Sequence, residues 1–154
     1  MFLNVRHEEV IIPKKAIRYR IIANSNSFSD QEKKFYVNSL IEPILKKILD
    51  KSNNIEESRK NIKNNIPKIK SILDTQGIDY NINYGMNYFP KKVYRKTEYN
   101  EGNYESLVIT LGNGLGDNWW CCLFPPLCLM EATESDLDDL EYSFYIKDII
   151  NKYL

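Results

Sequence analysis

The densest group of chemically notable residues in this chain of 154 residues is the stretch GNGLGDNWWCCLFPPLCLM, residues 112–130. It contains three alternating glycines, a tryptophan pair, three cysteines and a proline pair. Residues of these types could form a phosphate-binding loop, a thiol or metal site, or a rigid surface that contacts another protein. Each kind of site needs further residues at defined positions, and the remaining sequence shows which of them are present.

The three glycines, Gly112, Gly114 and Gly116, follow a predicted strand, as they would in a dinucleotide-binding motif. Such a motif needs a helix directly after the glycines, because the amides at its N-terminus bind the pyrophosphate. Here the sequence continues with residues 118–121, NWWC, which favour a strand. The glycines therefore predict a tight loop with positive φ angles, and no cofactor is predicted.

The cysteines lack the partners that a metal site or a catalytic thiol would need. The only histidine is His7, and its segment has no matching Cys/His spacing. We therefore predict no metal ligands and no catalytic residues. Two interpretations remain: the prolines 125 and 126 could turn the chain so that Cys121 and Cys128 form a disulfide, or the thiols could be free core residues.

The adjacent side chains of Trp119 and Trp120 point to opposite sides of an extended segment. One ring can then anchor the core while the other reaches toward solvent or a groove. An exposed tryptophan beside Phe124 and the proline pair is typical of a protein-contact hot spot. Burial of both rings under the glycine loop is the alternative interpretation.

Composition limits the function classes further. Lys+Arg and Asp+Glu number 21 each, so the net charge is zero, which argues against nucleic-acid binding. No apolar run approaches the ~20 residues of a membrane helix. The N-terminus has no apolar run of signal-peptide length, so we expect a soluble chain. We expect an N-terminal extension over residues 1–15 and one domain over residues 16–154.

The elements that must position these residues can be read from periodicity. Residues 16–24 alternate as a strand, with Arg18 and Arg20 on its polar side. The spacing predicts helices near 30–50, with a capping box at Ser29 and Glu32, and over 54–76, with Gly77 as a left-handed cap. Residues 78–84, 88–94 and 104–111 are predicted strands. Gly85 and Asn87 are predicted to break the extended structure between the first two, and residues 101–103 are predicted to form a turn.

Together these elements predict an α+β fold: a single domain with a mainly antiparallel or mixed sheet, two longer helices packed on one face and a short C-terminal helix. The sheet should contain residues 16–24, 78–84 and 104–111. The side chains expected to be buried together are Leu40, Ile44, Ile62, Ile66, Ile69, Leu107 and Ile109.

Four segments of the chain resemble the stage II sporulation protein R family in order and spacing. They are IRYRIIANSNSFSDQEKK (17–34), NYGMNYFPKKVY (83–94), EGNYESLVITLG (101–112) and GDNWWCCLFPPLCLM (116–130). The resemblance covers residues 17–130, and its most specific part is NWWC-x-LFPPLC.

The resemblance implies a signalling protein that is not an enzyme and has no cofactor. Members of this family are made in the forespore and exported into the space between the two sporulation membranes. There they activate a membrane-embedded aspartic protease of the mother cell, which removes the pro-sequence of sigma-E. The export segment expected of the family is not present in this chain. A thiol-dependent hydrolase or thiol exchanger that uses Cys121 or Cys128 is the alternative function.

Residue by residue, the family pattern also marks Asn24 and Ser25, Pro90, and Gly102, Tyr104 and Glu105. An exported protein meets an oxidising space, so the resemblance favours the Cys121–Cys128 disulfide, with Cys122 as a core residue. The surface that we expect to contact the protease consists of Gly112, Gly116, Asn118, Trp119, Trp120, Phe124, Pro125 and Pro126, with Tyr88 and Phe89 beside them.

Overall fold

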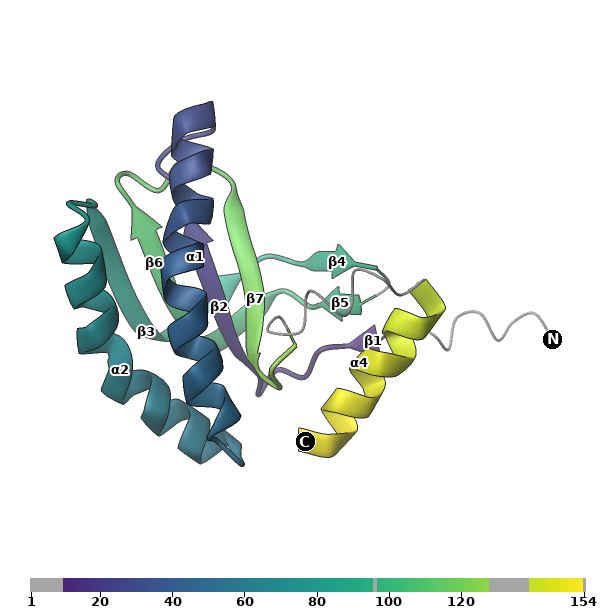
Figure 1. Ribbon diagram of the computed structural model, residues 1–154. Helices are drawn as coiled ribbons and strands as arrows, with labels where there is room; N and C mark the ends of the chain where they lie inside the picture. The colour runs from purple at the N-terminus through teal and green to yellow at the C-terminus, as the bar shows by residue number, and fades with distance from the viewer. Residues whose placement is uncertain (1–9, 96, 128–138, 154) are drawn as a thin grey trace.

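The computed structural model describes residues 10–95, 97–127 and 139–153 (Figure 1). Within these residues the chain forms three helices and seven strands, and the strands make two sheets. The elements are β1 (Val10–Ile11), β2 (Ile17–Ile22), α1 (Phe28–Asp50), α2 (Ile55–Thr75), β3 (Tyr80–Phe89), β4 (Lys92–Tyr94), β5 (Thr97–Tyr99), β6 (Gly102–Leu111), β7 (Asn118–Phe124) and α4 (Asp139–Tyr153). No described helix is long and apolar enough to span a membrane.

The larger sheet is mixed and has the strand order β3-β6-β2-β7. Its central strands β2 and β6 are parallel, whereas β3 pairs with β6 and β7 pairs with β2 in antiparallel fashion. Helices α1 and α2 lie side by side over one face of this sheet (Figure 1). The predicted α+β fold, with two long helices on one face and a C-terminal helix, is confirmed.

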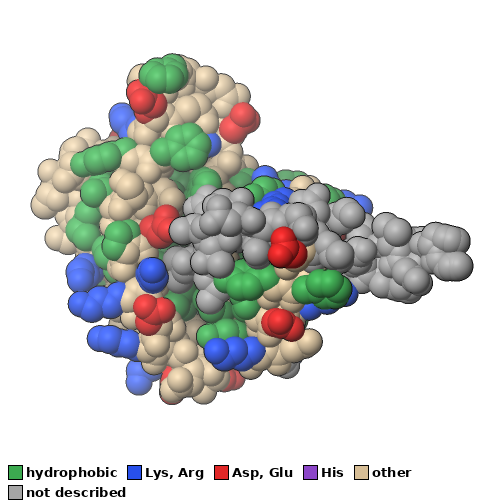
Figure 2. Space-filling view, turned by 45° about the vertical axis from the view of Figure 1, so that its right-hand side comes forward, with side chains coloured by type: hydrophobic (Ala, Val, Ile, Leu, Met, Phe, Trp, Pro, Cys, Tyr) green, Lys and Arg blue, Asp and Glu red, His purple; other side chains and the backbone are tan. Residues whose placement is uncertain are grey.

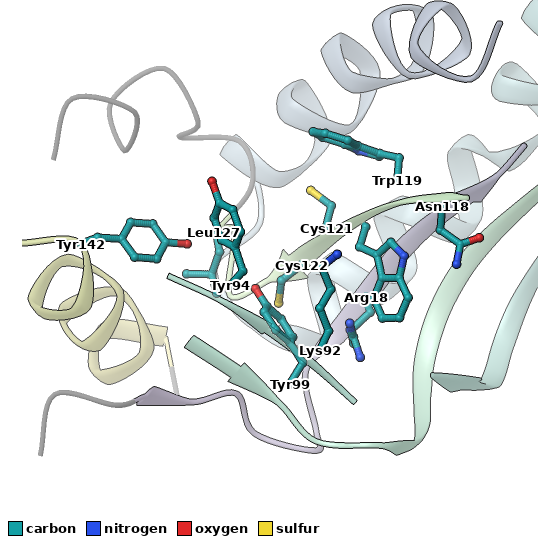
Figure 3. A pocket seen from close by; sticks show the side chains of 11 residues that line it. Arg18, Lys92, Tyr94, Tyr99, Asn118, Trp119, Cys121, Cys122, Leu127 and Tyr142 are labelled. Carbon is teal, nitrogen blue, oxygen red and sulfur yellow. The ribbon is translucent and has the colours of Figure 1, made fainter. Parts of the chain in front are cut away.

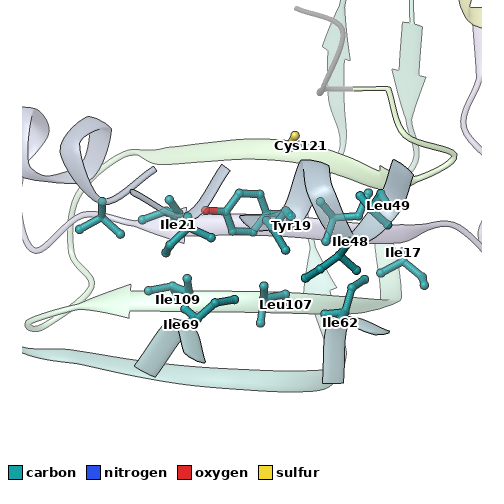
Figure 4. Packing of buried hydrophobic residues seen from close by; sticks show 14 of the residues in the cluster. Ile17, Tyr19, Ile21, Ile48, Leu49, Ile62, Ile69, Leu107, Ile109 and Cys121 are labelled. Carbon is teal, nitrogen blue, oxygen red and sulfur yellow. The ribbon is translucent and has the colours of Figure 1, made fainter. Parts of the chain in front are cut away.

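The main core lies between this face and the two helices (Figure 4). Alternate residues of β2 and β6, such as Tyr19 and Leu107, point toward the helices and are buried. The helix α1 contributes Val37, Ile41 and Leu45. Of the predicted core residues, Ile62, Ile69, Leu107 and Ile109 are fully buried, whereas Leu40, Ile44 and Ile66 are only partly buried. Ile44 and Ile66 still pack against this core, so for these residues the prediction overstated only the extent of burial.

The N-cap of helix α1 lies two residues before the predicted cap, Ser29. This N-cap is Ser27, whose Oγ accepts a hydrogen bond from Asp30 N at 3.1 Å. The predicted Ser29–Glu32 capping box is therefore wrong, because Asp30 occupies the third helical position and accepts hydrogen bonds from Asn24 and Ser25. The predicted ends of α2 are confirmed: Asn54 is the N-cap, and Gly77 has a φ of +66°.

Two segments that the sequence predicts to interrupt the sheet belong to continuous strands in the structure. Gly85 and Asn87 lie inside β3, and Gly102 and Asn103 belong to β6, where they pair with Phe89 and Tyr88. The polar residues are tolerated because β3 is an edge strand that alternates between exposed and half-buried positions. Of the turn predicted at 101–103, only Glu101 therefore lies outside the strand β6.

A second, three-stranded sheet has the order β1-β5-β4 and lies beside α4 (Figure 1). Strand β1 is parallel to β5, and the side chains of Val10 and Ile12 are buried. These two residues join a second cluster that contains Cys122, Leu127 and α4 residues. The folded part of the chain therefore begins before residue 16, inside the segment that the sequence suggests is an extension.

Candidate partner-binding surface

The glycine loop between β6 and β7 crosses the end of β2 and is fastened to residues 23–26. Asn113 N and Asp117 N donate hydrogen bonds to the side-chain oxygens of Asn24 and Asn26, at 2.8 and 2.7 Å. A β-carbon at Gly116 would lie 2.3 Å from Ser25 O. Glycine is therefore required for close approach at this position, and the loop is held in a defined conformation.

The two tryptophans lie on opposite faces of β7, as their alternation predicts. Trp119 packs edge-to-face against Phe35 of α1, with ring centroids 6.3 Å apart. Trp120 packs against Phe89 on the face away from the helices, at 5.5 Å. Both rings are partly buried, so each has an anchored side and an accessible side.

The guanidinium of Arg18 lies in a cage of aromatic rings next to Trp120. The ring centroids of Phe89, Tyr104, Tyr99 and Trp120 lie 4.1, 4.6, 4.7 and 5.1 Å from its Cζ atom. Only 1% of Arg18 is exposed. Arg18 does lie on the strand side opposite Ile17 and Tyr19, as its alternation predicts, but the small sheet, through Tyr99 of β5, covers this part of β2.

Arg18 is incompletely satisfied. Its Nε and Nη1 atoms have no hydrogen-bond partner within the described part of the chain. Burial, as the largest effect, lowers the pKa of Arg18, and the neighbouring Arg20 acts in the same direction. A buried donor without a partner costs about 1–3 kcal/mol, which the surrounding rings partly offset through cation–π attraction.

Arg59, in contrast, is paired with a carboxylate. Its Nε and Nη2 atoms donate to the two carboxylate oxygens of Glu105 at 2.6 and 2.8 Å, and Tyr84 donates to the same carboxylate. This bidentate pair ties α2 to β6 and β3. Glu105, which the family pattern marks, therefore has a structural role away from β7.

A pocket of about 190 Å³ opens beside Arg18, between β7, the small sheet and α4 (Figure 3). Lys92 of β4 lies at its mouth, with its Nζ atom 5.0 Å from the Trp120 ring centroid. The described side chains that line the pocket include no aspartate or glutamate; they are Arg18, Lys92, Tyr94, Tyr99, Asn118, Trp119, Trp120, Cys121, Cys122, Leu127 and Tyr142.

Sequence reasoning identified the β7 residues of this pocket but missed Arg18, Lys92, Tyr94 and Tyr99. These residues come from β2 and from the small sheet, far from β7 in the sequence. No sequence signal marks these residues, because strand alternation puts Arg18 on the polar side of its strand and the three others lie in short segments.

Further basic groups gather around the tryptophans. Arg20 donates to Tyr88 O at 3.2 Å, and the carboxamide oxygen of Asn118, turned toward both donors, accepts from Arg20 Nη2 at 3.0 Å and from Trp120 Nε1 at 3.3 Å. Lys34 is 3% exposed, and its pKa is lowered mainly by burial and additionally by Lys92. The whole chain has no net charge, and the face in Figure 2 shows acidic and basic side chains interspersed with apolar ones. The positive charge at β7 is therefore local.

The proline pair turns the chain after β7. The Phe124–Pro125 peptide bond is cis, and Leu127 N donates to Cys122 O at 3.2 Å and to Pro125 O at 2.8 Å. Cys121 is disulfide-bonded, and the side chain of Cys122 is buried. Cys128 lies outside the described residues, so its identity as the partner of Cys121 stays a prediction.

The described residues offer little for thiol or metal chemistry. Burial raises the pKa of Cys122 to about 12, so this thiol is neutral and a poor nucleophile at neutral pH. No group of three or more His, Cys, Asp or Glu residues in the described part of the chain could hold a metal ion. His7 lies outside the described residues.

The predicted contact residues fall into two groups. Phe89, Phe124 and Pro125 are buried, so a partner cannot touch them and they can only support the surface from below. The others are accessible, fully or in part: Tyr88, Gly112, Gly116, Asn118, Trp119, Trp120 and Pro126. Contact between this second group and a partner stays a prediction.

The fold and this surface describe an α+β domain with a preorganised aromatic and basic patch, which suits the recognition of another molecule. The family model described as Stage II sporulation protein R (spore_II_R) matches residues 13–134. The chain therefore belongs to the stage II sporulation protein R family.

One relative is the curated Stage II sporulation protein R of Bacillus subtilis (strain 168), which is 38% identical over 136 residues. The alignment covers 84% of this chain and 61% of the relative, so the chain spans less than two thirds of that protein. No solved structure gives a significant match.

Proposed function

We propose that this protein is an intercompartmental signal of sporulation. In this proposal it is exported from the forespore into the intermembrane space. There it binds a membrane-embedded aspartic protease of the mother cell, and the activated protease processes pro-sigma-E. The observation that carries the proposal is the family match over residues 13–134, which includes the whole of β7 and its loops.

The structure supports a binding role through rigidity. The glycine loop is fastened to Asn24 and Asn26, and Trp120 is held by Phe89 and Asn118. A patch that is already ordered loses little entropy on binding. Such a ligand shifts a protease toward its active state by binding that state more tightly.

The test is co-expression of this chain, directed to the appropriate compartment, with the candidate protease and pro-sigma-E, scoring cleavage of the sigma factor. The informative variant is Leu115→Asp, because Leu115 is 79% exposed at the tip of the glycine loop. The matched control is Phe144→Asp, because Phe144 is a 54% exposed apolar residue on α4.

We expect cleavage with the wild-type chain and with Phe144→Asp, and a loss of most cleavage with Leu115→Asp. Both variants must accumulate to wild-type levels for the comparison to hold. If the wild-type chain causes no cleavage above background, the proposed function is wrong. Normal cleavage with Leu115→Asp would show that the glycine loop is not part of the contact surface.

The alternative function, a thiol-dependent hydrolase or exchanger, gains no support from the described residues. Cys121 is 9% exposed and disulfide-bonded, and the Cys122 thiol is buried. A thiol enzyme would need an accessible thiolate with a lowered pKa. Of the two cysteines assigned to that function, Cys128 lies outside the described residues.

A further inference from the structure

The pocket beside Arg18 combines three features that point to a ligand of one chemical type. Arg18 lines the pocket, and only 1% of its surface is exposed. Two of its guanidinium nitrogens have no hydrogen-bond partner in the described part of the chain. Lys92 adds a second positive charge at the mouth. None of the described lining residues carries a negative charge. Among the described residues, no carboxylate lies beside these two positive charges.

Another arginine of this chain shows which group can complete the hydrogen bonds of a guanidinium next to this sheet. Arg59, on the helix-covered face, is neutralised by the two carboxylate oxygens of Glu105. Arg18, on the opposite face, has aromatic rings around it but no such carboxylate among the described residues. A carboxylate matches the planar fork of a guanidinium, whose faces can stack on aromatic rings at the same time.

The size of the pocket limits the ligand. At about 190 Å³ it is smaller than the 300–1,000 Å³ that drug-sized molecules and cofactors occupy. It has room for one side chain of a polypeptide. Tyr94 and Lys92 are exposed at the mouth, so they are the groups that can move aside for an entering side chain.

We propose that this pocket receives an aspartate or glutamate side chain from the partner protein, and that its carboxylate binds between Arg18 and Lys92. The identity of the partner rests on the function proposed above, whereas the carboxylate chemistry rests on the pocket alone. Trp120 and Asn118 form the wall that joins the pocket to the rest of the β7 surface.

The first experiment measures the pocket without a protease. The probe is the α-amide of N-acetyl-aspartate, and the neutral control probe is the α-amide of N-acetyl-asparagine. Binding is followed by NMR at the indole N–H of Trp120 and the Nε–H of Arg18. We expect saturable shifts with the aspartate probe only, weaker at high salt because charge attraction is screened.

The matched variants are Lys92→Gln and Lys91→Gln, which avoid removal of the buried Arg18. Lys91 is the sequence neighbour of Lys92 but is not among the residues that line the pocket. Its Nζ atom lies 3.9 Å from Oε1 of Glu98. We expect Lys92→Gln to weaken aspartate-probe binding about threefold and Lys91→Gln to leave it unchanged. Equal shifts with the aspartate and asparagine probes, or no shift with either, would overturn the carboxylate site.

The second experiment repeats the protease co-expression with Lys92→Glu and Lys91→Glu. A selective loss of cleavage with Lys92→Glu supports the assignment of the pocket to the protease. Normal cleavage with Lys92→Glu, together with aspartate-probe binding, overturns that assignment. If the wild-type chain binds the probe but causes no cleavage, the proposed function fails while the carboxylate site stands.

Discussion

The two faces of the central sheet differ in chemistry although they are built from the same strands. The face under α1 and α2 is aliphatic, with Ile21, Leu107 and Ile109 fully buried. The opposite face carries Arg18 and Trp120 among aromatic rings, and two guanidinium nitrogens of Arg18 have no partner in the described part of the chain. Alternation along β2 and β6 sends one residue to each face in turn.

This difference separates stability from recognition. Burial of aliphatic side chains contributes about 25 cal/mol per Å² and gives the helix-covered face its role in holding the fold. The unpaired guanidinium nitrogens of Arg18 lower stability, and a ligand that accepted hydrogen bonds from them would offset that cost. The comparison therefore predicts that changes on one face alter folding, whereas changes on the other alter the proposed recognition of a partner.

The largest expected effect on stability is that of Leu107→Ala. Leu107 is fully buried on a central strand beneath the helices, so its truncation should lower the free energy of unfolding by about 2–5 kcal/mol. Chemical denaturation measures the loss. Sigma-factor cleavage per folded molecule should not change, and a larger fall in cleavage than in folded protein would break the comparison.

A smaller effect is expected for Cys121→Ser. A bridge to the predicted partner Cys128 would close a short loop, so its removal should lower the free energy of unfolding by about 2–3 kcal/mol. Cleavage of the sigma factor should persist at temperatures where the variant is folded. Complete loss of activity in a folded Cys121→Ser protein would instead favour the thiol-enzyme alternative.

The smallest effect concerns the Arg59–Glu105 pair. Hydrogen bonds from Arg59, as the largest cause, lower the pKa of Glu105 in the folded chain. The carboxylate therefore stabilises the fold above its unfolded pKa of about 4.3, and this contribution is lost as the pH falls through the folded pKa.

Glu105→Gln should consequently lower the free energy of unfolding by about 1 kcal/mol at pH 7, and by less in acid. Denaturation curves at several pH values compare the variant with the wild-type chain. A difference that grows as the pH falls would contradict the assigned role of Glu105.

Much of the fold followed from local patterns in the sequence. The alternation in residues 16–24 and 104–111 and the caps Asn54 and Gly77 gave the right elements in the right places. The errors arose where side chains outside an element decide its ends. Asp30, held by Asn24 and Ser25, moves the start of α1, and pairing with Gly102 carries β3 to Phe89.

The candidate site was only partly predictable for the same reason. The segment around Trp119 and Trp120 is conspicuous in composition, and the resemblance to the family drew attention to it. The positive side of the pocket comes from Arg18 and Lys92, which are distant in sequence and look like ordinary solvated residues. Only the packing of the small sheet against β2 and β7 brings them together.

The most direct test of the account is the affinity of the purified chain for the candidate protease embedded in lipid nanodiscs. Two aromatic truncations are compared, Trp120→Ala on the β7 surface and Tyr36→Ala on α1, where Tyr36 is 48% exposed. Thermal unfolding first confirms that both variants are folded at the temperature of the assay. We expect Trp120→Ala to weaken binding by more than about tenfold and Tyr36→Ala to bind like the wild-type chain. Wild-type affinity in Trp120→Ala, or an equal loss in Tyr36→Ala, would contradict the assignment of recognition to the β7 surface.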